Sequence, residues 1–600
     1  MYRPFARDRD QSFSKTDGVN LYLLSRPWAL RSIQNLNNNI KDVIGTNLAA
    51  RFLDKQFTNK LSEADWRNTI KSLQKLLTDT AIRESLLHMP ADIYPISGEF
   101  IYQRLQSRRD NMMDYGMRYY KIINREVTIT GTDDKELFSI NRPDDENVEI
   151  TIQALSKRND RRDTIFHRIF NHNVTKEINL YGLRGDDEFI YEGSSNNILV
   201  RTLGNEESDK YIDSTNHKIV HTKIYDVRDD APASLKNFHY HSMNDTSFTN
   251  YDRRWFKYDW WIPLIFPSYN PDDGVLIGPG LIYKKQKWNK NPYGWQQMFG
   301  GTYAAGTGAF SIFYKGKFKQ VFGKWDLDVT ANYKAPSYVI NFYGLGNETE
   351  LLVKNKSYYR TRATSLYINP GVSRSWENIT FKTGLVFNTF KVKPDDSKIV
   401  GQVIPGIDSS VFTTKYFAGA NVDFTVNTSN SSKYPTKGIV FDAGSSYFSN
   451  LKENKRRFLN LGGSFTFYYS PVKGITLAHR SGAATNIGEF EYYQGNTLGG
   501  SENLRGYWRT RFTGQTNFYQ NTDVRWLFAG LKGNILRGGL GIYGFFDDGR
   551  VWIKDEDSDE FHTGYGGGIF FIPYGALALN ISFATSKEVN VFTIRAGFLF

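Results

Sequence analysis

Long runs in which apolar and polar residues alternate occupy the sequence from Trp255 to Phe600. In Lys415–Asn427, every second residue is apolar and the residues between them are largely polar. Successive side chains of a β-strand point to opposite faces, so this pattern predicts strands with one apolar and one polar face. No window approaches about 18 continuous apolar residues, so the sequence predicts no transmembrane helix.

The length of these runs favours a membrane barrel over a soluble β-sandwich array, which also alternates and is the alternative. A membrane strand needs about 9–11 residues, and Tyr and Trp stand near the run ends, as in interfacial girdles. An open sheet has two edges whose backbone groups hydrocarbon cannot satisfy, so the sheet must close. About fifteen such runs can be placed, and because a barrel of this kind normally has an even number of strands, we expect a mainly β protein in which residues 251–600 form a sixteen-stranded antiparallel transmembrane β-barrel.

The composition limits the chemistry that is available. Aromatic residues make up 15% of the chain, and there are no cysteines. The absence of cysteines excludes disulfides, Cys-ligated zinc and thiol catalysis, and suits a chain that crosses an oxidising periplasm. The net charge of +12 is dispersed, without a basic helical stripe. We interpret it as surface and lumen charge facing anionic lipid, and expect no nucleic-acid partner.

Two further regions precede the predicted barrel. Residues 1–126 are expected to be helical: Ser62–Asp65 is a capping-box pattern, followed by apolar residues at helical spacing. These apolar residues are Trp66, Ile70, Leu73 and Leu77, and a second helix is expected to follow Ser97 and continue toward Tyr120. Residues 127–250 change to β-type periodicity and predict a small polar β-rich domain, sheet-like or solenoid-like, in which no clean repeat is visible.

Leu498–Phe512, with the sequence LGGSENLRGYWRTRF, is an unusual connection between two predicted strands. It is too long for a periplasmic turn, which indicates an extracellular loop. Its glycines allow tight folding and its aromatic residues offer packing surfaces, so we expect the loop to fold back into a polar lumen. An arginine held there requires a carboxylate partner.

Two spaced motifs resemble those of the BamA-type outer-membrane superfamily, also called the bacterial surface antigen family. Leu504-Arg505-Gly506-Tyr507 resembles its (V/I/L)-R-G-(F/Y) signature in the sixth extracellular loop, and Phe545-Phe546-Asp547-Asp548-Gly549 resembles its F-x-D-x-G strand motif. The resemblance covers roughly residues 255–600. It implies that Asp547, flanked by Phe545 and Gly549, holds Arg505 inside the barrel. Strand alternation agrees, because it groups Asp547 with Tyr543 and Phe545 on one face, where an ionised carboxylate avoids lipid.

The end of the chain strengthens this resemblance. Phe598 and Phe600 resemble the terminal aromatic signal by which outer-membrane barrels are recognised for insertion, and we expect them to continue the alternation of Phe592, Ile594 and Ala596 on the final strand. Asn341–Thr349, with the sequence NFYGLGNET, is similar to segments in family barrels from Bacteroidota.

The resemblance implies a function. Members of this superfamily insert other barrels into the outer membrane or move polypeptide across it, and a lumen loop and a weak seam between first and last strands belong to that picture. We therefore expect a non-enzymatic protein of the Gram-negative outer membrane without a cofactor. The expected partners are outer-membrane lipid and lipopolysaccharide, the barrel-assembly machinery, and a polypeptide substrate or the protein's own upstream domain.

One departure from the family pattern leaves an alternative open. No POTRA repeats are recognisable upstream, which places general insertase activity in doubt. Pro4–Phe13 resembles a segment of long Bacteroidota outer-membrane proteins in which a calcineurin-like phosphoesterase and a kinase-like segment precede the barrel. The barrel would then anchor and export an upstream phosphoesterase that this chain lacks, and residues 1–126 would be a kinase-like remnant or fragment. The N-terminus shows no apolar signal core, so we expect a signal peptide upstream or a truncated chain.

Weaker patterns have ordinary structural interpretations. Asp8 and Asp10 could hold a divalent metal, but no phosphate-cradling glycine loop accompanies them, and surface salt bridges are the favoured interpretation. Asp186 and Asp187 lie in a glycine–aspartate turn that could bind calcium, although any β-turn has such residues. His239 and His241 share one strand face, without a third ligand at a recognisable spacing. With no G-x-S-x-G elbow either, we expect no catalytic residues and no metal.

Overall fold

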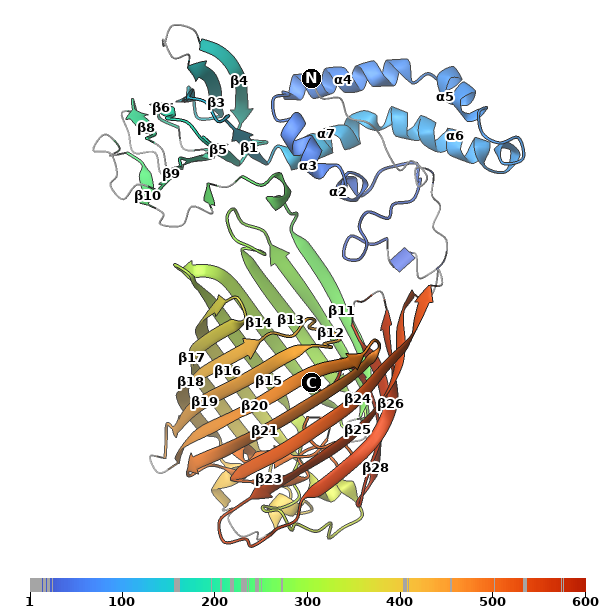
Figure 1. The fold of residues 1–600 in the computed structure, drawn as a ribbon, viewed down its shortest axis with the longest axis vertical. Helices are drawn as coiled ribbons and strands as arrows, with labels where there is room; N and C mark the ends of the chain where they lie inside the picture. The colour runs from blue at the N-terminus through green and yellow to red at the C-terminus, as the bar shows by residue number, and fades with distance from the viewer. Residues whose placement is uncertain are drawn as a thin grey trace. The chain divides into compact units, whose positions relative to one another are not determined.

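The computed structural model describes residues 13, 18, 22–23, 25–155, 162–195, 197–205, 208–215, 221–227, 235, 237–242, 248–249, 251–270, 274–402, 407, 409–453, 456–500, 502–532, 537–573, 575 and 577–600. The chain divides into two compact units, Met1–Lys257 and Tyr258–Phe600 (Figure 1). Each unit is described by itself below. Within the described part of the chain, no helix combines the length and the apolar character needed to cross a membrane.

Helices form the first part of the N-terminal unit. They are α2 (Val43–Thr46), α3 (Arg51–Phe57), α4 (Glu63–Leu76), α5 (Asp79–Leu86), α6 (Tyr94–Asp110) and α7 (Met112–Ile123), followed later by the short 3-10 helix η3 (Arg253–Trp255). The expected capping box begins α4: the Ser62 hydroxyl accepts from the N–H of Asp65, and the Asp65 carboxylate accepts from the N–H of Ser62. Ile70 is buried, whereas Leu73 and Leu77 are exposed, so the predicted apolar stripe is only partly covered.

The second predicted helix differs from expectation at its start and in its continuity. It begins at Tyr94, three residues before Ser97, because Pro95 occupies the first turn, where a missing N–H is tolerated. The helical path to Tyr120 is then broken at Asn111, which separates α6 from α7.

Two five-stranded sheets complete the N-terminal unit. Their strands are β1 (Glu126–Thr130), β2 (Glu136–Arg142), β3 (Asn147–Leu155), β4 (Arg162–Asn171), β5 (Glu177–Tyr181), β6 (Glu188–Gly193), β7 (Leu199–Leu203), β8 (Lys210–Asp213), β9 (Thr222–Asp226) and β10 (His239–Ser242). One sheet has the order β1-β5-β7-β9-β10 and is parallel. The other has the order β4-β3-β2-β6-β8, parallel from β2 to β8. The chain thus alternates between two sheets, which is the solenoid-like form of the predicted β-rich domain.

Buried carboxylates join the successive turns of this β-roll. Asp187 Oδ1 accepts the backbone N–H of Glu136 at 2.9 Å, and Asp209 Oδ1 accepts that of Asp187 at 3.0 Å. Glu136, Asp187 and Asp209 each follow a glycine by five positions, at Gly131, Gly182 and Gly204. A side chain at any of these glycines would collide with the carboxylate that follows it. This spacing is a repeat, although no clean repeat was visible in the sequence, and its carboxylates accept hydrogen bonds from the backbone.

The second unit is a closed antiparallel barrel, as predicted. The described residues form its sixteen strands: β11 (Trp260–Asn270), β12 (Gly274–Lys285), β13 (Trp295–Ala304), β14 (Ala309–Phe322), β15 (Trp325–Asn341), β16 (Arg360–Trp376), β17 (Ile379–Val392), β18 (Lys415–Asn427), β19 (Gly438–Asn450), β20 (Arg457–Val472), β21 (Ile475–Gly488), β24 (Thr516–Lys532), β25 (Arg537–Trp552), β26 (His562–Pro573), β27 (Leu579–Ser586) and β28 (Asn590–Ala596). The number agrees with the expectation from run length.

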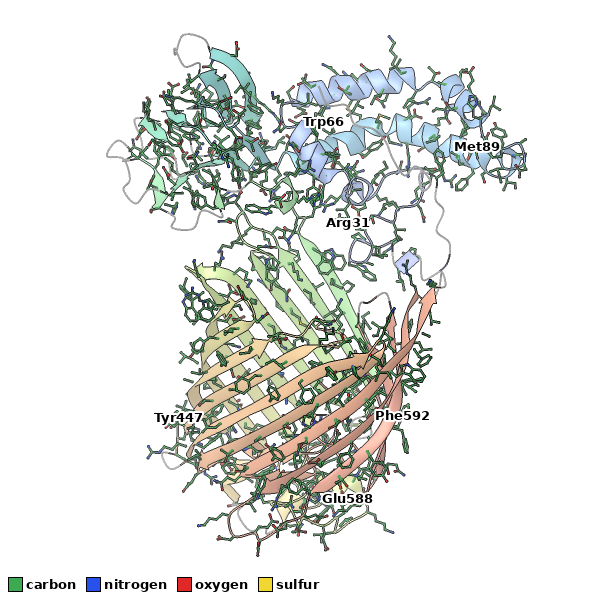
Figure 2. The ribbon with its side chains drawn as sticks, in the orientation of Figure 1. Arg31, Trp66, Met89, Tyr447, Glu588 and Phe592 are labelled. Carbon is green, nitrogen blue, oxygen red and sulfur yellow. The ribbon has the colours of Figure 1, made fainter. Side chains whose placement is uncertain are left out.

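The two faces of the barrel wall differ as the alternation requires. On β25, Ile542 and Phe546 are exposed outward, whereas Tyr543, Phe545 and Asp547 are buried on the inner face. Figure 2 shows Tyr447 and Phe592 on the barrel wall, and both are among its exposed large side chains. The outward face is therefore an apolar surface, which suits hydrocarbon.

The connections at the two ends of the barrel are unequal. At one end, here called the loop end, β15 leads to β16 through residues 342–359, β17 to β18 through 393–414, and β21 to β24 through 489–515. These connections carry the short helices η4 (Lys356–Tyr359), η5 (Ile399–Gly401), η6 (Ser409–Phe412) and η7 (Tyr492–Gln494) and the strand pair β22 (Asn496–Leu498) and β23 (Phe512–Gly514). The opposite end, the turn end, has mostly short turns such as 323–324 and 473–474. In outer-membrane barrels in general, the long loops lie on the extracellular side and the short turns on the periplasmic side.

Candidate functional site in the barrel lumen

The connection between β21 and β24, here called the lumen loop (residues 489–515), packs against the inner wall of the barrel. Its apolar side chains form a small core with Val551 of β25. The loop members of this core are Leu498, Leu504, Tyr507 and Phe512, each at most 1% exposed. Leu504 and Tyr507 of the motif therefore hold the loop against the wall by packing.

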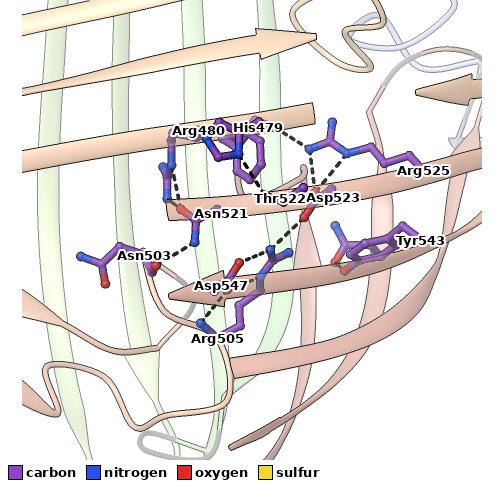
Figure 3. A network of polar contacts seen from close by, with 12 residues as sticks. His479, Arg480, Asn503, Arg505, Asn521, Thr522, Asp523, Arg525, Tyr543 and Asp547 are labelled. Atoms are coloured by element: carbon purple, nitrogen blue, oxygen red, sulfur yellow. Dashed lines mark hydrogen bonds and ion pairs between the residues drawn. The ribbon is translucent and has the colours of Figure 1, made fainter. Parts of the chain in front are cut away.

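Arg505 points from this loop to two carboxylates on the wall (Figure 3). Its Nε and Nη2 donate to the two oxygens of Asp547 at 2.7 and 2.6 Å, which is a bidentate contact. Its backbone N–H donates to the same carboxylate at 2.9 Å. The guanidinium lies 3.7 Å from the centroid of the Phe545 ring, a cation–π contact. The loop motif that contains Arg505 and the strand motif that contains Asp547 are thus in direct contact.

Asp523 on β24 is a second acid at this site, which sequence reasoning missed. Arg505 Nη2 donates to it at 2.8 Å, and Arg525 donates to it at 2.8 and 3.1 Å. Asp523, Arg525 and Asp547 are completely buried, so the charges are compensated by one another rather than by solvent. The strand register could have suggested Asp523, since it lies opposite Phe545 on the neighbouring strand.

Glycines make the space that the loop needs. Gly506 has φ of +92°, and a Cβ there would stand 2.6 Å from the carbonyl oxygen of Thr585. A Cβ at Gly549, the last position of the strand motif, would stand 2.7 Å from the carbonyl oxygen of Phe518 on β24 and 3.2 Å from the Leu498 side chain of the loop. A third position, Gly564 on β26, was not singled out from the sequence: a Cβ there would overlap the carbonyl oxygen of Arg505.

A second arginine anchors the same loop. Arg511 is 1% exposed, donates to Glu588 at 2.8 Å and to the hydroxyl of Thr349 at 2.8 Å. Glu588 lies in the turn between β27 and β28, and the hydroxyl of Ser586 beside it donates to the carbonyl of Gly506 at 2.7 Å. The lumen loop is therefore attached to the last hairpin of the barrel as well as to β24 and β25.

The Asn341–Thr349 segment crosses the loop end to reach these elements. The side-chain amide of the buried Asn347 donates to Ser558 at 2.8 Å and to the carbonyl of Glu560 at 3.0 Å. Its backbone N–H donates to Glu556, and its side-chain oxygen accepts the N–H of Val551 at 3.0 Å. This segment is a strap that joins β15 to the connection between β25 and β26, a role that its sequence alone did not reveal.

Space remains inside the barrel beside the lumen loop. A cavity of about 620 Å³ separates the loop from the wall formed by β18 to β21. Its polar lining includes Asp423, Asp442, Asn496, Asn503 and Asn517. The lumen loop and the strap lie at the loop end, and the cavity beside them has a mainly polar lining.

Phe598 and Phe600 differ from expectation. The final strand ends at Ala596, and Gly597, with φ of +90°, turns the chain away from the outer face. Phe598 then packs inside the wall, 5.0 Å from the ring of Phe570, while Arg525 donates to the main-chain oxygen of Phe600 at 2.9 Å. The expected continuation of the outward alternation to Phe600 is wrong, because a glycine at positive φ breaks the strand.

The weaker metal candidates gain no support from the geometry. Asp8 and Asp10 lie outside the described residues. In the part of the chain that the structure describes, no group of three or more His, Asp or Glu side chains is arranged to hold a metal ion. Asp187 accepts a backbone N–H, and Asp186 accepts that of Ser208 at 3.0 Å. His241 stacks on Tyr225, and burial lowers the pKa of its imidazole.

Comparison with known proteins finds similarity of fold at low identity. No protein-family model matches the sequence, and no curated protein matches it. Among solved structures, the chain is similar to BamA from Haemophilus ducreyi lacking POTRA domains 1–3, at 13% identity and a TM-score of 0.43, covering 56% of this chain and 70% of that one. It is similar to CdiB from Escherichia coli at 12% identity and a TM-score of 0.38, covering 62% and 68%. CdiB from Acinetobacter baumannii matches at 12% identity and a TM-score of 0.37, covering 61% and 63%.

Proposed function

We propose that this chain is a non-enzymatic outer-membrane barrel that inserts or translocates polypeptides at that membrane. The proposal rests on the barrel wall beside the lumen loop, where two neighbouring strands are joined by few hydrogen bonds while the loop itself is anchored inside the barrel. Among the described residues, β11 and β28 pair only through Tyr269 and Ile594, whereas β27 and β28 pair over seven residues. We call the boundary between β11 and β28 the seam.

Separating two neighbouring strands of the wall requires the least free energy at the seam, because few hydrogen bonds must break there. Separation exposes two strand edges, which in hydrocarbon need backbone partners. An incoming polypeptide can supply them by adding as a strand. The lumen loop keeps part of the interior filled while this happens, and its attachment to the β27–β28 turn ties it to one side of the seam. Partners in this proposal are membrane lipid, the assembly machinery that inserts the barrel itself, and the polypeptide.

Locking the seam tests the proposal. In this Cys-free chain, Tyr269→Cys with Ile594→Cys places a disulfide across the seam, and Thr302→Cys with Ser311→Cys places one across the well-paired strands β13 and β14. Each variant is reconstituted in vesicles with a urea-unfolded small outer-membrane barrel as the probe, and folding of the probe is followed by its heat-modifiable band shift. We expect the oxidised seam pair to slow probe folding and reduction to restore it, while the control pair has no effect.

The alternative role, export of a domain encoded upstream, gives a different result. A protein dedicated to its own upstream domain would not accelerate folding of the probe, with or without the disulfide. Oxidation of the seam pair would instead reduce the surface exposure of that domain in cells expressing a chain that contains it. Equal probe folding in protein-free vesicles and in vesicles with the reduced protein would contradict the insertion role.

A further inference from the structure

A cluster of cationic side chains lies on the outer face at the loop end of β16 and β17. On β17, Leu385 is 67% exposed and lies on the outward face. Every second residue of the strand shares that face, and this series continues to Lys391 and Lys393, which are also exposed. Arg362 on β16 is also exposed, and the N–H of Lys393 donates to its carbonyl at 2.8 Å. Arg362 and Lys393 are therefore neighbours on adjacent strands, at the level where the apolar wall ends.

These cations border a small hollow. A cavity of about 190 Å³ is lined by Thr361, Arg362, Lys393, Asp395 and Lys398. Asp395 is already engaged: hydrogen bonds from Ser397 are the main cause of its lowered pKa, with further contributions from Lys398 and Lys393. Within the described residues, the side chains of Arg362 and Lys393 form no hydrogen bond or ion pair. In the described part of the chain, the hollow thus presents two cations whose N–H groups have no direct acceptor, although Lys393 is close enough to Asp395 to lower the pKa of that carboxyl.

An apolar groove lies on the same outer wall, nearer the middle of the barrel. Its volume is about 640 Å³, and it crosses strands β12 to β16. Phe299, Ile312 and Tyr333 line it and are 47%, 58% and 38% exposed, while Gly300 and Gly301 leave its floor without side chains. Leu366 on β16 forms one edge of the groove. It is four residues from Arg362 on the same face, a separation of about 13 Å along the strand.

We propose that this wall binds a phosphorylated membrane lipid, with a phosphate at Arg362 and Lys393 and an acyl chain in the groove bordered by Leu366. A guanidinium binds phosphate oxygens through two hydrogen bonds and an ammonium adds a point charge, which matches the pair in the hollow. The apolar groove lies in the direction of the hydrocarbon, where an acyl chain continues from a headgroup. Free phosphate would use only the first half of the site. The inference rests on the proposed membrane location and names a lipid partner for the barrel wall.

Retention of a defined lipid tests this site. The purified protein is reconstituted in phosphatidylcholine nanodiscs that contain a minor fraction of bisphosphorylated lipid A, and lipid that stays bound after transfer to detergent is measured by native mass spectrometry. The test variant is Arg362→Gln with Lys393→Gln. The control, Lys354→Gln with Lys452→Gln, removes the same charge from exposed positions on other loops of the same end. We expect the test variant to lose retention by about tenfold or more, as expected for two charge-assisted contacts, and the control to match the unmodified protein.

Further measurements distinguish binding of the whole lipid from binding of phosphate alone. Dephosphorylated lipid A should be retained poorly, inorganic pyrophosphate at equal concentration should not compete, and Leu366→Ser should also weaken retention. Equal loss in both charge variants, unchanged retention in the test variant, or full competition by pyrophosphate would each overturn the site. A heat-modifiable band shift verifies that every variant is folded. If lipid retention fails while locking the seam still slows probe folding, the lipid site is wrong and the proposed function stands.

Discussion

Replacement of Arg505 by alanine should release the centre of the lumen loop from the wall. The hydrogen bonds to the Asp547 carboxylate all come from Arg505 among the described residues, whereas Asp523 keeps Arg525 as a partner. Asp547 is completely buried, so the substitution leaves an uncompensated charge. Breaking a buried pair in this way costs about 3–5 kcal/mol, which lowers the equilibrium constant between the anchored and the released loop by roughly 10²- to 10⁴-fold.

The assay uses a cross-link between the loop and the wall. The side-chain amide of Asn521 on β24 donates to the carbonyl of Asn503 at 2.8 Å, so Asn503→Cys with Asn521→Cys brings two thiols near each other. A short bis-maleimide should join them efficiently when Arg505 is present and poorly in the Arg505→Ala background. Arg505→Lys should restore only part of the yield, because an ammonium cannot reproduce the planar bidentate contact.

Asp547→Asn supplies the internal control for the magnitude. Arg505→Ala leaves the buried Asp547 carboxylate without a partner, and Asp547→Asn removes that charge. The double variant Arg505→Ala with Asp547→Asn should therefore be less destabilised than Arg505→Ala alone. The barrel hydrogen bonds are unaffected, so all variants should keep the heat-modifiable band shift. Equal cross-linking with and without Arg505 would refute the reasoning, because the loop would then be held by its apolar packing and by Arg511.

Three further predictions concern other parts of the chain. Gly564→Ala should displace the loop and lower the same cross-linking yield, because its Cβ overlaps the Arg505 carbonyl. Gly544→Ala on the outward face of β25 should have no effect, because its Cβ meets only the carbonyl oxygen of Gly566 at 3.8 Å, an ordinary contact. Tyr434, in the β18–β19 turn, stacks on Phe570 at 5.5 Å near the turn end, so Tyr434→Ser should raise the conductance measured in planar bilayers, and Tyr469→Ser on the outer face should not. Burial lowers the pKa of Lys55 to about 8, below its usual 10.5, so protonation of this amine opposes folding at neutral pH. The N-terminal unit should therefore gain about 3 kcal/mol of stability as pH rises from about 8 to about 10.5, measured by proteolysis in urea, and Lys55→Met should abolish this gain; stability that falls over that range would contradict the assignment.

The parts of this molecule that follow from local pattern were predictable. Alternation depends only on residues two positions apart, and it correctly indicated the barrel and the inward face of Asp547. The number of strands was predicted from the length of the runs and from the preference of such barrels for an even number. The contact between Arg505 and Asp547 was implied by the resemblance of two spaced motifs to those of a known family. Asp523 and the partners of Arg511 depend on strand register and on long-range packing, which no single segment specifies.

Two errors have local causes that the sequence did contain. Gly597 stops the final strand, and the alternation of phenylalanines around it concealed this signal. In the β-roll, the spacing between Gly131 and Glu136 recurs at Gly182 and Gly204, but variable residues between them masked the repeat. Parallel pairing of those strands joins segments tens of residues apart, so it could not be inferred from any one of them.

The strap that ends at Thr349 also constrains the order in which the molecule can assemble. Asn347 finds its partners at Ser558 and Glu560, more than 200 residues further along the chain. A contact of such sequence separation forms late, because the intervening chain must first lose its freedom. The strap therefore cannot dock until β25 and β26 are in place, when few strands remain to be added. Docking of the strap over the loop end thus requires a nearly complete barrel. A barrel whose assembly stops at an earlier strand keeps its loop end open.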